Sequence, residues 1–381
     1  AVDELLADPA VDTVNSLDQQ RIALREIIPP VEAELLEEPP TWAYYPWRRS
    51  LVALLGPRSF QRLRLDRNRN KITATEQERL GALRIGIVGL SVGHAIAHTL
   101  AMEGLCGLIR LADFDELELS NLNRIPATVF DLGLNKAVVA ARRIAELNPY
   151  LPLEVGTEGV TPETMTEFLS GLDLVVEECD SLDVKVRIRE VARAAGIPVL
   201  METSDRGLLD VERFDLEPDR PLFHGLLGDV RSSDLAGLSS KDKVPHVLRI
   251  LEPDELSARM AASMVEVDET LTTWPQLGSD VTLGAATIAT AVRRIGQGGT
   301  VSPVGSGRAR IDLAATIDAL AQPPEPRDLS SARVREPVAV TGPDGLDAMG
   351  AIAQALRLAP SGGNAQPWRF VRSGAGLQVH L

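Results

Sequence analysis

The 381-residue chain is long enough for two or three domains, and its 44% apolar and 24% charged residues are typical of a soluble globular protein. A formal net charge of -15 disfavours nucleic acid as a partner, and two isolated cysteines, Cys106 and Cys179, exclude a disulfide framework and a cysteine-rich zinc site. No apolar run reaches membrane-spanning length, and the first residues lack a secretory signal, so the expected location is cytoplasmic, without membrane contact.

Residues 1–80 predict a helical arm. A helix is expected over Ser16–Ile27, followed by two Pro-Pro breaks. The aromatic and basic run Trp42–Arg49 is expected to pack this arm onto the next domain. We therefore treat residues 1–80 as a separate N-terminal segment.

Residues 81–297 alternate between apolar strand-like runs and amphipathic helices. Such alternation predicts a Rossmann-like α/β fold, with a mostly parallel sheet covered by helices on both faces. The expected strands are Ile85–Val88, Leu108–Ala112, Leu174–Glu177 and Ile197–Met201. The expected helices run to Met102 after the first strand, then over Asn135–Leu147, Thr161–Gly171, Leu182–Ala195 and Val281–Ile295, with a polar, loop-rich stretch before the last.

The remaining chain has a different pattern. Residues 298–330, with Pro323–Pro326, are expected to form a linker. Residues 331–381 hold one predicted helix, Leu346–Leu358, and are too few for a stable core, so they are expected to be the start of an incomplete module.

A glycine-bearing turn, Gly89-Leu-Ser-Val-Gly93, joins the first predicted strand to its helix. Glycines there let the backbone approach a phosphate, and a helix N-terminus favours its negative charge. Asp113 ends the next strand 24 residues after Gly89, where nucleotide-binding folds place a carboxylate on ribose hydroxyls. A tight turn without a ligand is the alternative for the turn alone.

Further polar residues suit a nucleoside triphosphate. Arg124, in the segment Ser120-Asn-Leu-Asn-Arg, and Lys136 at a helix start supply two cations, and Asn121 supplies an amide. Asp180 follows a later strand and suits magnesium. Each residue alone also fits an ordinary cap or surface ion pair, and the acidic run from Asp115 to Glu118 also fits a solvated edge.

Taken in order, these motifs resemble the ThiF/MoeB proteins and the ubiquitin-activating E1 enzymes. The resemblance covers roughly Arg67 to Gln297 and includes the element Gly133-Leu-Asn-Lys136. It implies ATP and Mg2+ as cofactors, and an adenylyltransferase that activates a carboxylate with release of pyrophosphate. The residues that it implies for nucleotide binding are Gly89, Ser91, Gly93, Asp113, Asn121, Arg124 and Lys136, with Arg124, Lys136 and Asp180 catalytic and Asp180 and Asp113 on magnesium.

The resemblance also implies partners. The carboxylate would belong to a small molecule or to the C-terminus of a protein such as a ubiquitin-like or sulfur-carrier protein. Family members are usually homodimers, in which an arginine from the partner's N-terminal segment can complete the site. Arg67 or Arg69 is the matching residue here.

The sequence departs from the family pattern in several places. The glycine turn is one residue shorter than G-x-G-G-x-G, and Ile125 stands where glutamine is common. The two CxxC zinc pairs are missing, and no cysteine follows Cys179 in this sequence to form a thioester. Residues 359–370 resemble the FMN-binding motif of nitroreductases, with Ser361, Asn364 and Gln366 near flavin, as in the fusion proteins labelled MoeY; FMN is expected only if that module is completed.

Three other functions compete with adenylation. Gly89–Gly93 also reads G-x-S-x-G, so a serine hydrolase would use Ser91 with His224. An NAD(P)-dependent reductase would use the same glycine turn, and a noncatalytic E1-like scaffold would keep the fold without turnover. His94 and His98 have metal-ligand spacing but no third ligand, so a structural role is favoured.

Overall fold

The computed structural model describes residues 2–267, 269–297, 304–321, 369–373 and 376–380. The chain divides into two compact units, residues 1–319 and residues 320–381. In the second unit the structure describes a hairpin of β11 (Arg369–Ser373) and β12 (Gly376–His380). The predicted helix Leu346–Leu358 and the three residues proposed near flavin lie outside the described residues.

A seven-stranded sheet forms the centre of the first unit, and its strands follow the order β10-β9-β8-β7-β4-β5-β6. The pairings from β8 across to β6 are parallel, and β9 and β10 join antiparallel at one end. The bounds are β4 (Arg84–Val88), β5 (Leu108–Ala112), β6 (Leu153–Gly156), β7 (Leu174–Glu177), β8 (Val199–Thr203), β9 (Leu208–Glu212) and β10 (Gly307–Arg310). The mostly parallel sheet is thereby confirmed, and the four predicted strands are four of its members.

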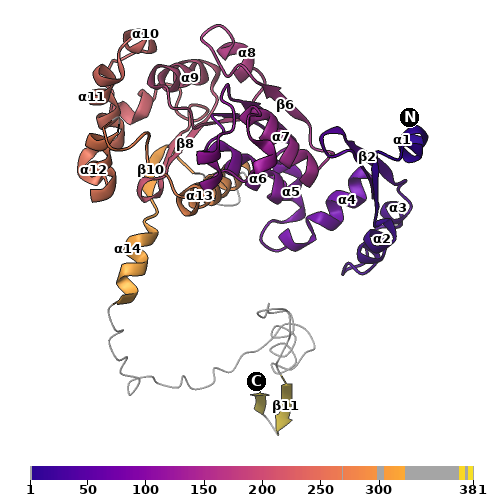
Figure 1. Cartoon of the computed structure of the whole chain (residues 1–381). Helices are drawn as coiled ribbons and strands as arrows, with labels where there is room; N and C mark the ends of the chain where they lie inside the picture. Colours follow the sequence, from indigo (N-terminus) through magenta and orange to yellow (C-terminus); the bar gives the residue numbers. More distant parts are fainter. Residues whose placement is uncertain (1, 268, 298–303, 322–368, 374–375, 381) are drawn as a thin grey trace. The chain divides into compact units, whose positions relative to one another are not determined.

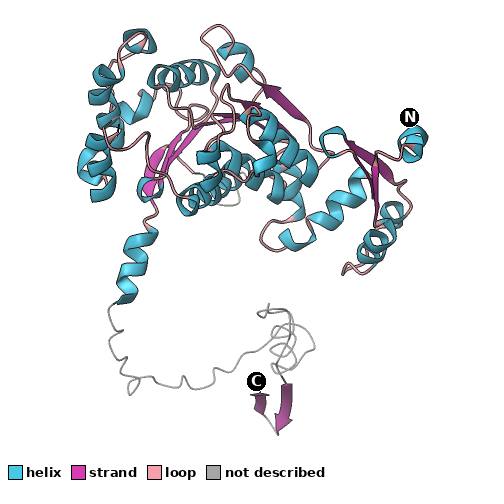
Figure 2. Cartoon of the chain, in the orientation of Figure 1, coloured by secondary structure: helices cyan, strands magenta, loops and turns pink. Residues whose placement is uncertain are grey.

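Helices cover both faces of this sheet, as predicted (Figure 2). On one face α6 (Gly93–Glu103) and α13 (Gly278–Gly296) pack in a core with Ile85, Ile87 and Leu200. On the other, α9 (Leu182–Ala195) and the short α8 (Met165–Leu169) pack on Val175 and Val199. α7 (Lys136–Leu147) joins the first core through Ala137 and Ile144, and α5 (Ala74–Leu80) through Leu80.

The N-terminal segment is not the helical arm that the sequence predicted. It contains a three-stranded sheet in the order β1-β3-β2, made of β1 (Asp12–Asn15), β3 (Ser50–Leu54) and β2 (Thr41–Tyr45). Burial alternates along β3, and β2 is aromatic, which are the features of half-buried strands. The accompanying helices are α1 (Val2–Ala7), α2 (Leu17–Arg25), α3 (Ala33–Leu36) and α4 (Pro57–Arg64) (Figure 1).

Three further expectations need correction. The helix expected over Thr161–Gly171 shrinks to α8, because Thr161 and Thr164 exchange hydrogen bonds in a turn before Met165. The stretch expected to be loop-rich holds β9 and three helices, and residues expected as loop and linker include β10 and a helix. These helices are α10 (Ser232–Leu235), α11 (Ser240–Leu251), α12 (Ala258–Glu266) and α14 (Leu313–Asp318). Within the described ranges no helix is both long and apolar enough to cross a bilayer.

Candidate functional site

The glycine turn lies between β4 and α6, where the order of the sheet reverses. The chain adds β5 and β6 on one side of β4 and then β7 on the other. In open α/β sheets, ligands bind outside the carboxyl ends of the strands at such a reversal. The turn therefore occupies the position that the fold favours for a ligand.

Both glycines of this turn are required by residues that pack closely against them. Gly89 has φ +85°, and a Cβ there would lie 2.5 Å from the carbonyl oxygen of Glu178. A Cβ on Gly93 would lie 2.8 Å from Cγ2 of Ile87. The close approach of β4, β7 and α6 therefore already explains these glycines, without a bound phosphate.

Gly89→Ala is expected to lower the free energy of unfolding by about 3 kcal/mol, the sum of a left-handed backbone penalty and a collision with β7. The matched control is Gly196→Ala, since Gly196 also has positive φ but a Cβ there meets nothing within 4 Å. The control should cost only about 1–2 kcal/mol. Urea unfolding followed by circular dichroism measures both, and equal losses would contradict the collision.

Asp113 is fixed against the glycine turn. It follows β5 and is only 7% exposed. Its Oδ2 accepts a hydrogen bond from the backbone N–H of Leu90 at 2.6 Å, and its Oδ1 accepts one from Asp115 at 2.8 Å. Burial raises the pKa of Asp113 although these two bonds act in the opposite direction. The carboxyl group is thus held at the turn by backbone donors.

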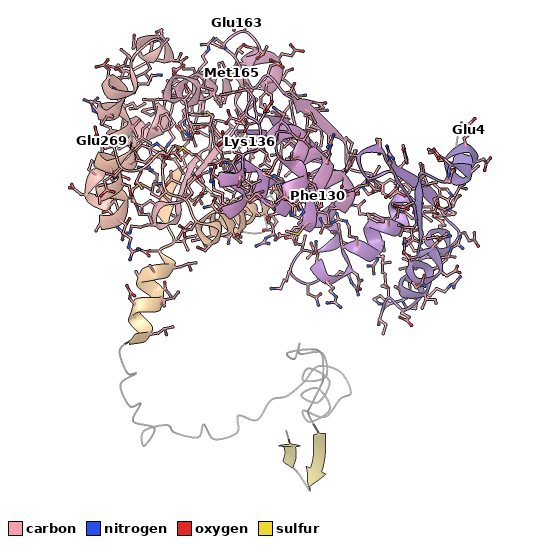
Figure 3. All side chains as sticks on the ribbon, in the orientation of Figure 1. Glu4, Phe130, Lys136, Glu163, Met165 and Glu269 are labelled. Carbon is pink, nitrogen blue, oxygen red and sulfur yellow. The ribbon has the colours of Figure 1, made fainter. Side chains whose placement is uncertain are left out.

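Lys136 lies beside Asp113 at the start of α7. Its ammonium pairs with Oδ2 of Asp115 at 2.8 Å, and its side chain is mostly buried. Asn135 caps the helix by accepting from the N–H of Ala137, and its Nδ2 donates to the carbonyl oxygen of Asp113 at 2.9 Å. Figure 3 shows Lys136 in the α/β part of the chain. Sequence reasoning gave no role to Asn135 or Asp115, although an Asn before a helix is a recognisable cap signal.

Arg124 also contacts the glycine turn. It follows the 3-10 helix η3 (Leu119–Asn123), and its Nε donates to Oγ of Ser91 at 3.0 Å. Burial lowers the pKa of Arg124, and the nearby carboxylate of Asp180 partly offsets this. Asn121 is buried, and its Oδ1 accepts from the backbone N–H of Glu118, so this side chain helps to form η3.

Asp180 lies just beyond β7 and is exposed. The chain before it is fixed by Glu177, whose Oε1 accepts from the backbone N–H of Cys179 and pairs with Lys185, both at 2.9 Å. The carboxyl ends of β4, β5 and β7 thus bring two linked groups to one turn. Arg124 bonds Ser91 and lies near Asp180, whereas Asp113 bonds Leu90 and lies near the pair of Asp115 and Lys136.

The histidines do not join this cluster. His224 pairs through Nε2 with Asp210 at 3.0 Å and through Nδ1 with Arg220, whereas Ser91 bonds Arg124, so the Ser91–His224 pair of a hydrolase is not formed. His94 is buried in α6, and burial lowers its pKa to about 3. Among the described residues, no group of three or more His, Cys, Asp or Glu side chains could hold a metal ion.

A cavity of about 360 Å³ lies elsewhere, between the N-terminal sheet and the end of α7. Its lining includes Val52, Phe60 and Leu147, and the ion pair of Arg48 with Glu146 borders it. Lys136 begins α7 and Leu147 ends it, so this cavity and the polar cluster are at opposite ends of one helix. The cavity carries none of the cations or carboxylates gathered at the glycine turn.

Comparison with known proteins finds similar sequences for this region. Residues 65–232 match the model of the ThiF family. Along its whole length the chain is 57% identical to "Uncharacterized protein MT1398" of Mycobacterium tuberculosis, of which it covers 53%. It is 32% identical over 157 residues, 40% of the chain, to the sulfur carrier protein adenylyltransferase of Thermus thermophilus, of which it covers 55%.

A third relative has a different printed activity. The chain is 34% identical over 129 residues, 33% of its length, to the tRNA threonylcarbamoyladenosine dehydratase of Escherichia coli, and covers 48% of that protein. The chain thus spans about half the length of each of these three relatives. The match to the ThiF family model covers residues 65–232, the stretch that holds the glycine turn, Arg124, Lys136 and Asp180.

Proposed function

We propose that this domain binds ATP with magnesium at the carboxyl edge of its sheet and transfers AMP to a carboxylate. The observation that carries the proposal is the linkage of the cluster through one turn: Arg124 bonds Ser91 at 3.0 Å, and Asp113 bonds the neighbouring Leu90 at 2.6 Å. The relative named a sulfur carrier protein adenylyltransferase supports the same reaction type.

The chemistry of the side chains suggests how they would divide the nucleotide. Asp113 keeps acceptor capacity for ribose hydroxyls while its backbone bonds hold it in place. Arg124 and Lys136 would neutralise the phosphates, and Lys136 would either leave Asp115 or bind it and a phosphate at once. Asn121 would hold the shape of η3, which leads to Arg124. Asp180, with Asp113, would hold magnesium, a cation that usually takes one or two protein carboxylates together with phosphate oxygens.

In the proposed reaction an oxygen of the substrate carboxylate attacks the α-phosphorus of ATP. A P–O bond forms to give the acyl-adenylate, and the bond between the α-phosphorus and the bridging oxygen breaks, so pyrophosphate leaves with its electron pair. Arg124 and Lys136 stabilise the negative charge that gathers on the leaving group. Magnesium, when bound, would supply a Lewis acid that stabilises the negative charge of the phosphates.

ATP–pyrophosphate exchange with candidate carboxylates tests the reaction type. Asp180→Ala should lower the exchange rate at least tenfold, because magnesium loses a ligand while the exposed position leaves the fold intact. The matched control is Asp18→Ala, another exposed aspartate, which should leave the rate unchanged. An unchanged rate in Asp180→Ala would remove Asp180 from the site.

A noncatalytic nucleotide-binding scaffold is the second candidate. It is favoured by the internal partners of two proposed ligands, since Lys136 already pairs with Asp115 and Asn121 already caps η3. ATP binding by calorimetry without any exchange would select the scaffold. Nicotinamide binding without ATP binding would select a reductase instead.

If the chain forms a homodimer in which an arginine from the partner completes the site, local contacts help to choose between Arg67 and Arg69. Both arginines are exposed, but Arg69 pairs with Asp66 and donates to the carbonyl oxygen of Ile28, whereas Arg67 makes no such contact among the described residues. Of the two residues, we therefore propose Arg67 as the one that reaches a second copy. We also propose that the carboxylate comes from a small molecule or from the C-terminus of a protein.

A further inference from the structure

A segment distant in sequence lies against the loop that carries Arg124. Nδ2 of Asn123 donates to the carbonyl oxygen of Gln276 at 2.8 Å, across 153 residues. A Cβ on Gly278 would lie only 2.8 Å from the carbonyl oxygen of Asn123. On its other side, Oδ1 of Asn123 accepts from Nη1 of Arg124 at 3.0 Å. Asn123 therefore connects residues 271–277 to the guanidinium group of the candidate site.

The joined segments expose large apolar side chains beside a polar cluster. Leu277, next to Gly278, is 62% exposed, Trp274 is 42% exposed, and Leu119 of η3 is 69% exposed. Trp274 lies two residues before Gln276, so their Cα atoms are at most about 7 Å apart. Residues 271–277 contain no charged side chain. Exposed apolar groups bordering convergent polar groups are typical of ligand sites.

We propose that the carboxylate substrate carries an uncharged apolar group, which packs on Trp274 and Leu277 when its carboxyl group reaches the nucleotide. This inference rests on the proposed function and names its substrate class. The wall formed by residues 271–277 offers no charge to pair with a second carboxylate, and its apolar area favours a group that leaves water. Asn123 is a positioning residue, because it holds this wall against the Arg124 loop.

Nonhydrolysable acyl-adenylate mimics test this class directly. Three acylsulfamoyl adenosines differ only in the acyl group: hexanoyl is apolar, succinyl carries a second carboxylate, and acetyl-diglycyl stands for an uncharged peptide C-terminus. Calorimetry on the full chain should find the hexanoyl mimic at least tenfold tighter than each of the other two. That factor corresponds to burial of about two methylene groups.

Variants test whether residues 271–277 cause the preference for the hexanoyl mimic. Trp274→Ala and Leu277→Ala should reduce the hexanoyl preference to threefold or less while the variants still bind ATP, which shows that they fold. Asn123→Ala should also reduce the preference, although it removes no apolar contact to the acyl group. Leu216→Ala, at an exposed leucine on another part of the surface, should leave all affinities unchanged.

The outcomes separate this inference from the proposed function. If the wild-type chain binds ATP but prefers the succinyl mimic, or binds all three mimics equally, the apolar class is wrong and the proposed reaction stands. Tightest binding of the acetyl-diglycyl mimic would overturn the apolar class in favour of a protein C-terminus. A chain that binds neither ATP nor any mimic would end the proposed function itself.

Discussion

Arg189→Met is expected to lower the free energy of unfolding by about 3–5 kcal/mol, among the largest effects of a single substitution in this chain. Arg189 is fully buried in α9. Its Nη1 donates to Glu177 at 2.7 Å, its Nε bonds Glu212, and its guanidinium group stacks on Phe223 with 3.8 Å to the ring centroid. Methionine removes the charge, so Glu212 loses its guanidinium partner and Glu177 keeps only Lys185 as a cationic partner among the described residues.

The pKa values of these carboxylates show how the charges depend on one another. Burial alone would raise the pKa of Glu177, but Lys185 and Arg189 hold it at about 2. Burial raises the pKa of Glu212 even with Arg189 present. Without Arg189, Glu212 is therefore expected to take up a proton or lose its packing, and part of the lost stability should return in the double variant Arg189→Met, Glu212→Gln.

Urea unfolding followed by circular dichroism gives the measurement. Arg187→Met is the matched control, because Arg187 lies on the same helix but pairs with Glu190 at the surface, where such pairs contribute at most about 1 kcal/mol. A loss below about 1 kcal/mol in Arg189→Met would mean that this buried network does not stabilise the sheet. Because Glu177 also fixes the backbone before Asp180, ATP–pyrophosphate exchange in the same variant reports on the candidate site.

The fold was most predictable where one local signal sufficed. The bounds of β5, β7 and α9 agree with the sequence prediction, because a buried parallel strand is a short continuous apolar run and α9 ends at Gly196 with φ +66°. The pairing of β1 with β3 could not be read in this way. Its partners Asp12 and Ser50 are far apart in sequence, and every residue of β1 is exposed, so no apolar pattern marks that strand.

Only part of the candidate site could be predicted from the sequence. Ser91, Asp113 and Asp180 lie just after strands, and the carboxyl ends of parallel strands meet at one edge, so their proximity could be inferred from the sequence. The partners that tie the cluster together could not. The contact of Asn123 with Gln276 depends on where α13 begins, and the pairing of Asp115 with Lys136 depends on the loop between them.

Glu202→Gln is expected to gain stability relative to the wild-type chain as pH rises from about 4.5 to about 8. Glu202 is 3% exposed on β8, and neither carboxylate oxygen has a hydrogen-bond partner among the described residues. Burial, with a smaller effect of Asp280, raises its pKa to about 8. The folded state therefore holds a proton that the unfolded chain releases near pH 4.5.

The sign follows from proton linkage. A group whose pKa is raised by folding contributes its full stability below the unfolded pKa and loses that stability as pH rises through the folded pKa. The shift from 4.5 to about 8 corresponds to an upper bound of roughly 5 kcal/mol between those limits. Glutamine stays neutral, so the variant should match the wild type at about pH 4.5 and exceed it by several kcal/mol at about pH 8.

The measurement is the difference in the free energy of unfolding between variant and wild type from about pH 4.5 to about pH 8. His94 has the opposite sign, since its lowered pKa costs stability as pH falls, but it is present in both proteins and cancels in the difference. Glu78→Gln, at an exposed glutamate, should give a flat difference. A flat curve for Glu202→Gln would mean that the carboxyl group gains water or a partner on ionising. Glu202 is also connected to the candidate site. Its backbone N–H donates to Glu178, which follows β7 and packs against Gly89 of the glycine turn.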